Sequence, residues 1–95
     1  MKNYKETYAE FKEKLELYVP VVAKVHGDSH PEFLEVKALY DSMKAALDGG
    51  AGDLDADFEK LRQITSDYAV PSDTCETYEA VYQMLEAIDR AYSAQ

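Results

Sequence analysis

Residues 18–40, YVPVVAKVHGDSHPEFLEVKALY, decide the fold because they end one helix, turn a corner and begin the next. Gly27 follows a run of helically spaced apolar residues, and a glycine just after a helix commonly adopts a left-handed conformation. Ser29 and Glu32 have the spacing of a capping box, which marks the start of a helix. We therefore expect one helix to end at Gly27 and a second to begin shortly after it.

The chain before this corner has an apolar side chain at every third or fourth position, which is the pattern of an amphipathic helix. These positions are Tyr4, Tyr8, Phe11, Leu15, Tyr18, Val22 and Val25. The pattern predicts a helix over residues 3–27. Pro20 lies inside it, and an interior proline removes one backbone hydrogen bond, so we expect the helix to bend there.

The same spacing recurs three more times along the chain and predicts helices over residues 30–48, 53–68 and 73–93. Asp73 and Glu76 form a second capping-box pattern at the start of the last helix. Glycines in the segment 48–53 favour a loop, and no segment alternates as a strand does. The sequence predicts an all-α, up-down four-helix bundle that forms a single domain over residues 1–95.

Composition excludes several classes of partner. Ten basic and nineteen acidic residues give a net charge of −9, which repels phosphate backbones and anionic lipids, so neither nucleic acid nor a membrane is expected as a partner. A single cysteine forms no disulfide within the chain, and the first residues lack the apolar core of a signal peptide. Both features favour the cytoplasm. Eight tyrosines in so small a chain favour self-association, such as a homodimer.

Both histidines lie in the corner segment. His26 follows Val22 by four residues, so it faces the core side of its helix, where it could bind a metal ion or cap the helix end. His30 lies across the corner and could add a second imidazole or be solvated. Glu32 and Glu35 are the nearby carboxylates that could complete such a site.

Cys75 falls in the first turn of the last predicted helix, where the helix dipole favours a thiolate. Asp73 and Glu76 flank it, however, and their negative charges oppose one. We therefore interpret Cys75 as a small structural residue. We find no convincing nucleophile arrangement and no phosphate-binding glycine loop, so the sequence does not predict an enzyme.

Two segments resemble hemerythrin-like di-iron proteins of the RIC type, the iron-sulfur cluster repair family. Residues 25–27 (VHG) and 30–32 (HPE) are similar to the VHG..HPEL corner of that family. The second segment is similar to the family pattern LR.LT..Y..P..AC.T....Y, and it comprises Leu61, Arg62, Thr65, Tyr68, Pro71, Cys75, Thr77 and Tyr82. The resemblance implies a hemerythrin-like bundle.

The resemblance also implies that most of the family's iron ligands are absent. His26 matches the histidine of the VHG motif. The family's helix-one histidine pair falls at Lys5 and Tyr8. Its helix-two His-Met, with a glutamate four residues after the histidine, is best matched by Ser42-Met43 and Ala46. Residues 91–93 stand where the last helix would have a ligand, and no histidine occurs between Asp48 and Leu61. We therefore expect no cofactor within a single chain, and iron is the ion to test for.

Two hypotheses follow. Under the first, the chain is a small cytoplasmic helical-bundle protein that has largely lost its iron site and has a non-catalytic interaction or accessory role, with a protein partner bound through a tyrosine-rich helical face. Under the second, it binds iron in iron-sulfur cluster repair through His26, His30 and Glu35, with the site completed across a homodimer or by a partner.

Overall fold

The computed structural model describes residues 3–49 and 52–94, and it contains four α-helices and no strand within that part of the chain. The helices are α1 (Tyr4–His26), α2 (Glu32–Leu47), α3 (Asp55–Thr65) and α4 (Glu76–Ser93). The predicted all-α four-helix bundle is therefore confirmed. Gly50 and Ala51 of the predicted glycine-rich loop lie outside the described residues, as do residues 1, 2 and 95 of the predicted domain.

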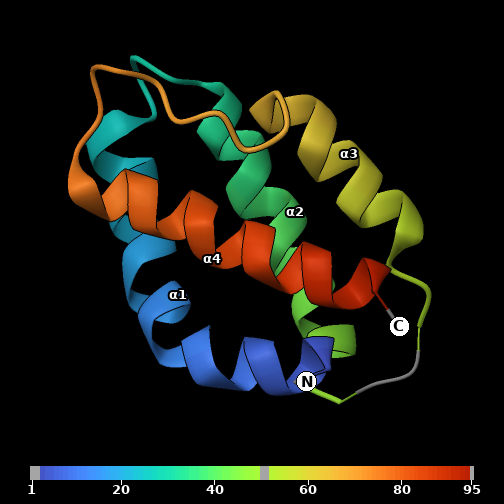
Figure 1. Ribbon diagram of the computed structural model, residues 1–95. Coiled ribbons are helices and arrows are strands. Elements are labelled where there is room, and N and C mark those ends of the chain that lie inside the picture. The colour runs from blue at the N-terminus through green and yellow to red at the C-terminus, as the bar shows by residue number, and fades with distance from the viewer. Residues whose placement is uncertain (1–2, 50–51, 95) are drawn as a thin grey trace.

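The α1–α4 pair positions the segment that contains the histidines. α1 packs against α2 and α4, and α2 packs against α3 (Figure 1). At one end of the pair the ring centroids of Tyr4 and Tyr92 lie 4.9 Å apart. At the other end His26, the last residue of α1, contacts Cys75, which directly precedes α4. The two helices are therefore antiparallel, and the α1–α2 turn meets the start of α4.

α1 has a capping box that the sequence predictions above did not use. The Asn3 side chain accepts a hydrogen bond from the Glu6 amide at 2.8 Å, and the Asn3 amide donates to the Glu6 carboxylate at 3.3 Å. Pro20 lies inside the helix and has no amide hydrogen to donate to the carbonyl of Glu16. Figure 1 shows α1 changing direction along its length, as expected for a helix with an interior proline.

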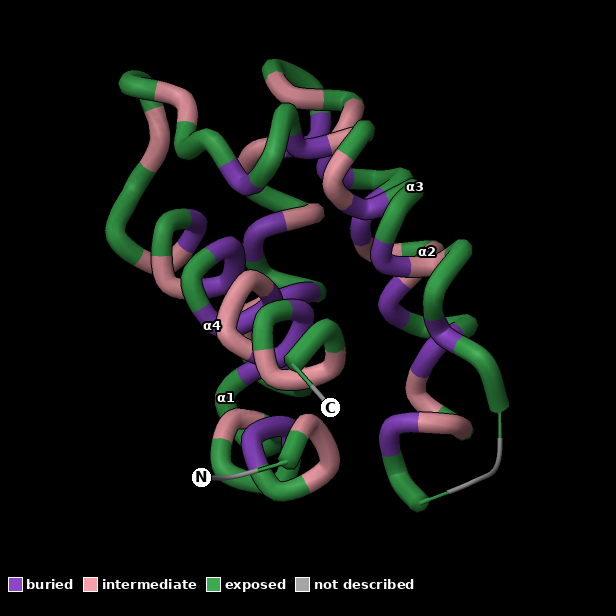
Figure 2. Tube along the Cα trace, turned by 45° about the vertical axis from the view of Figure 1, so that its right-hand side comes forward, coloured by how far each residue is buried: buried purple, intermediate pink, exposed green. Residues whose placement is uncertain are grey.

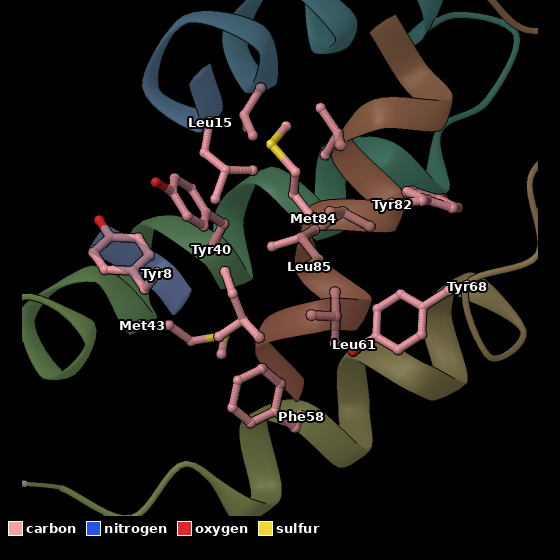
Figure 3. Close-up of a cluster of buried hydrophobic side chains, with 14 of the residues drawn as sticks. Tyr8, Leu15, Tyr40, Met43, Phe58, Leu61, Tyr68, Tyr82, Met84 and Leu85 are labelled. Carbon is pink, nitrogen blue, oxygen red and sulfur yellow. The ribbon is translucent and has the colours of Figure 1, made fainter. Parts of the chain in front are cut away.

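The core is one cluster of apolar side chains contributed by all four helices (Figures 2 and 3). It is unusually rich in tyrosine, because Tyr8, Tyr40, Tyr68, Tyr78 and Tyr82 are buried, and Tyr4, Tyr18 and Tyr92 pack against the cluster partly buried. The tyrosines therefore fill the core instead of forming the free helical face that we expected. The exposed large apolar side chains are Leu17, Val21, Val25, Leu34 and Val70.

Gly27 corrects one prediction. Its backbone is right-handed, with φ −58° and ψ −33°, so the expected left-handed turn is wrong. A glycine is nevertheless required by packing, because a Cβ atom at this position would overlap the carbonyl oxygen of Ala23 and would lie 3.0 Å from the side chain of Leu34. The corner is tight at Gly27 because α2 turns back closely against the end of α1.

α3 ends three residues earlier than predicted. Ser66, Asp67 and Tyr68 all have positive φ angles, of 53°, 61° and 64°, which are outside the helical range for these residues. Two hydrogen bonds hold this turn: the Asp67 amide donates to the Arg62 carbonyl at 2.7 Å, and the Tyr68 amide donates to the Thr65 hydroxyl at 2.8 Å. The turn directs the buried Tyr68 ring back toward α4.

Candidate functional site

The two histidines and the single cysteine meet at the corner where α1 ends, α2 begins and α4 begins. His26 is half-buried, and its Nε2 lies 3.3 Å from the Sγ of Cys75, where either atom can donate depending on the tautomer. Cys75 is exposed and is the N-cap residue of α4, but its side chain makes no capping hydrogen bond. The thiol therefore lies beside an imidazole, a contact that the sequence analysis did not predict.

The His30 side chain links the α1–α2 turn to the start of α2 and to the segment before α4. Its Nδ1 lies 2.9 Å from the Glu32 carboxylate, and its Nε2 lies 2.9 Å from the Asp73 carboxylate. Burial of the ring by itself lowers the pKa of His30, but the hydrogen bonds with Asp73 and Glu32 outweigh this and raise the pKa above its usual 6.5. The charged form of His30 therefore stabilises the contact between the α1–α2 turn and the segment before α4.

Both predicted capping boxes at this corner are wrong for the same reason. α2 begins after Pro31 and α4 begins after Cys75, and neither helix has a side-chain cap. Glu32 belonged to the first predicted box and Asp73 to the second, and both instead bind His30. A hydrogen bond to a charged imidazole is stronger than one to a neutral amide, which favours this arrangement over the local caps.

The rings of both histidines pack against the ring of Tyr78 in α4. Its ring centroid is 5.4 Å from that of His26 and 5.8 Å from that of His30, both in edge-on geometry. Tyr78 is fully buried, and its hydroxyl is 3.0 Å from that of Tyr82. The two imidazoles are therefore held by packing as well as by hydrogen bonds.

Of the three predicted metal ligands, the structure brings His26 and His30 to one corner, and of the two candidate carboxylates it places Glu32, and not Glu35, beside a histidine. Glu35 is exposed on α2 and is not a hydrogen-bond partner of either histidine in the described chain. Within residues 3–49 and 52–94, no group of three or more His, Cys, Asp or Glu side chains could hold a metal ion. One described chain thus offers at most the two adjacent donors of His26 and Cys75.

The bundle interior does not fit the di-iron centre that the resemblance implies. Tyr8, at one of the ligand positions, is 1% exposed and belongs to the apolar core, and Ala46, at another, packs against that core partly buried. Figure 3 shows the rings of Tyr8 and Tyr40 with both hydroxyl oxygens directed to the same side. Neither oxygen has a hydrogen-bond partner within the described chain, and burial raises the pKa of both phenols. A neutral phenol and an alanine methyl group are poor substitutes for imidazole and bridging carboxylate ligands.

A second polar cluster, which the sequence predictions missed, ties α3 to α4. Both carboxylate oxygens of the buried Asp89 accept from the same Arg62 nitrogen, at 2.7 and 2.8 Å, and the Tyr68 hydroxyl donates to Asp89 at 2.7 Å. An open cleft of about 540 Å³ borders these residues. The cluster satisfies the buried carboxylate and anchors the left-handed turn, so we interpret it as structural. The sequence alone does not reveal this ion pair, because Arg62 and Asp89 lie on two different helices and no local pattern shows that they meet.

Comparison with known proteins confirms the resemblance to iron-sulfur cluster repair proteins. The chain is 31% identical to the iron-sulfur cluster repair protein ScdA of Staphylococcus epidermidis over 121 aligned residues, which cover 92% of this chain and 54% of the relative. It is 28% identical to the protein of that name in Staphylococcus haemolyticus over 122 aligned residues, covering 93% and 55%.

The chain spans about half the length of these curated relatives. The alignments are also longer than this 95-residue chain, so the relatives have residues within the matched region that the chain lacks. No protein-family model and no solved structure matches the chain. In the described part of the chain, no helix has both the length and the apolar character needed to cross a membrane.

Proposed function

We propose that this chain is an accessory protein of iron-sulfur cluster repair that acts in the cytoplasm through a protein partner and has no catalytic step of its own. The name shared by the relatives supports the connection to cluster repair. The packed interior is the observation that supports a role without a di-iron centre. Positions that the resemblance assigns to iron ligands hold Tyr8, which is part of the core, and Ala46, which packs against it.

The physical basis of this proposal is the cost of opening such an interior. A di-iron centre needs several imidazoles and carboxylates that converge from the helices of a bundle. Here the same region is filled by close-packed side chains that include Leu15, Tyr40 and Leu85, and removing large buried side chains costs about 2–5 kcal/mol each. The chain would therefore keep a four-helix bundle while lacking room and ligands for the di-iron centre that the resemblance implies.

Iron content is the first test. The protein should be expressed with added iron, purified without a chelator or a histidine tag, and measured for bound metal and visible absorption. We expect a folded, helical protein with far less than one iron per chain and no oxo-bridged di-iron absorption. Two irons per chain would refute the proposed loss of the centre.

Repair activity tests the accessory role directly. A damaged iron-sulfur enzyme should be incubated with this protein alone, with the S. epidermidis relative alone, and with both. We expect no recovery with this protein alone and a changed rate of recovery when both are present. Recovery by this protein alone would contradict the non-catalytic role, and an unchanged rate with both would argue against a partnership with this relative.

A further inference from the structure

We propose that His26 and Cys75 form one half of a metal site that binds a zinc-like divalent ion, and that a second copy of the chain supplies the other half. The site would contain two imidazole nitrogens and two thiolates, which is a common donor set for tetrahedral zinc. It lies at the corner of the bundle and not in the interior. It does not rest on the proposed function, although it includes His26, the one residue that matches an iron ligand implied by the resemblance.

The distance between the two donors supports this assignment. In a tetrahedral zinc site the metal lies about 2.3 Å from sulfur and about 2.0 Å from imidazole nitrogen, so two such ligands are about 3.5 Å apart. Nε2 of His26 and Sγ of Cys75 are 3.3 Å apart without any ion between them. Only a small movement of either side chain is needed for both to bind one ion.

The surroundings hold the histidine in place but leave the thiol accessible. The His26 ring lies edge-on against the buried Tyr78, and its backbone is the last turn of α1. Cys75 is exposed at the start of α4. Acidic residues at this end of the molecule, including Asp73 and Glu76, favour a cation over an anion.

A second copy is required because the described chain supplies no third ligand. His30 is the other imidazole at the corner, but both of its ring nitrogens bind carboxylates. Two donors alone hold a divalent ion weakly, whereas a two-fold axis through the ion doubles the set to four. Val25, next to His26, is 65% exposed and Val70 is 37% exposed, so apolar surface beside the donors is available for contact with the second copy.

Cobalt titration of the reduced, untagged apoprotein tests the site. Co²⁺ reports thiolate ligands by a charge-transfer band and tetrahedral geometry by its visible spectrum. We expect one Co²⁺ per two chains, both spectral signatures, and a solution mass that doubles with the metal and returns to the monomer value with EDTA. Zn²⁺ should displace Co²⁺ without changing the mass of the dimer.

Three variants make the test specific. Cys75→Ser keeps a residue that is favoured at an N-cap, so the protein should stay folded, and His26→Gln removes the imidazole. Each should weaken Co²⁺ binding at least about 100-fold, since a direct ligand matters at least as much as its supporting residues. Glu35→Gln is the matched control, because Glu35 is exposed and is not a hydrogen-bond partner of either histidine, and this variant should bind Co²⁺ like the unmodified protein.

Several results would overturn the assignment. They are the absence of Co²⁺ binding, binding of one Co²⁺ per monomer, and a metal-dependent dimer that still forms with Cys75→Ser. A dimer that persists in EDTA under reducing conditions would also overturn it, because the metal would then not join the two copies. Iron bound in the bundle interior would not depend on Cys75, so failure of the proposed function can be told apart from failure of this site.

Discussion

His30 joins two distant parts of the chain at the corner. Its imidazole connects the α1–α2 turn to Glu32 of α2 and to Asp73, which lies 43 residues away in the chain. The imidazole is 15% exposed, whereas the carboxylates of Glu32 and Asp73 are 35% and 67% exposed, so water competes most for the bond to Asp73. The charge state of one residue therefore controls how firmly the segment before α4 is held.

This role predicts a pH dependence of stability. Because the folded-state pKa of His30 is raised, its contribution is fully present below the unfolded-state value near 6.5 and is lost as the pH rises through the higher folded-state pKa. Urea unfolding should therefore show a larger stability difference between the unmodified protein and His30→Gln at about pH 5.5 than at about pH 8.5.

Asp73→Asn provides the control for the effect of His30. Removal of the Asp73 charge should reduce the pH dependence that His30→Gln removes, and the two changes should not be additive because the residues are in direct contact. A stability difference between the unmodified protein and His30→Gln that stays constant, or that grows as the pH rises, would contradict the role of the charged imidazole.

At the scale of elements, the junction between α1 and α2 depends on a close approach at Gly27. A right-handed glycine would ordinarily be replaced by alanine with a gain of about 0.5–1 kcal/mol, because alanine has the higher helix propensity. Here the added Cβ would overlap the Ala23 carbonyl oxygen, which belongs to the backbone and cannot easily move. The energetic cost of this steric overlap therefore outweighs the gain in helix propensity that alanine would bring.

Gly27→Ala should accordingly destabilise the protein by about 1–3 kcal/mol, as overpacking does in other tightly packed sites. Thermal and urea unfolding followed by circular dichroism measure this. Gly52→Ala is the matched control, because a Cβ there would make only an ordinary contact, 3.6 Å from Ala46, and its stability should be nearly unchanged. Equal or greater stability of Gly27→Ala would show that the corner is looser than the structure indicates.

At the scale of the whole molecule, the described chain is as compact as a single folded unit of its length. Its radius of gyration is 12.5 Å, and a compact domain of this size is expected to have about 12.4 Å. All four helices contribute to one apolar cluster. α3 is joined to α4 by the Asp89 cluster and by ring contact between Phe58 and Tyr92.

We therefore predict that the protein unfolds in a single cooperative transition, as small domains usually do. The chain has eight tyrosines and no tryptophan, so tyrosine fluorescence reports on the core while far-ultraviolet circular dichroism reports on the helices. The two signals should give coincident unfolding curves in urea. A separate early transition in the dichroism signal would mean that α3 or another helix unfolds independently.

The helices could be predicted from sequence because the information that specifies them is local. Helical hydrogen bonds join residues four apart, and the apolar spacing from Tyr4 to Val25 records which face of α1 is buried. The sequence by itself thus determined the fold class, the approximate helices, the bend-inducing proline and the resemblance to repair proteins. It also located His26 and His30 at one corner, because only three residues separate them.

Only the tertiary structure decided which groups these residues contact. Cys75 lies beside His26 across 49 residues, and Asp73 binds His30 instead of capping α4. Sequence patterns show that a side chain could cap the helix next to it. They do not show that a charged residue far away in the chain binds the same side chain with a larger gain in free energy. That competition exists only once α1 and α4 are packed together, which is why the candidate site could not be read from the sequence.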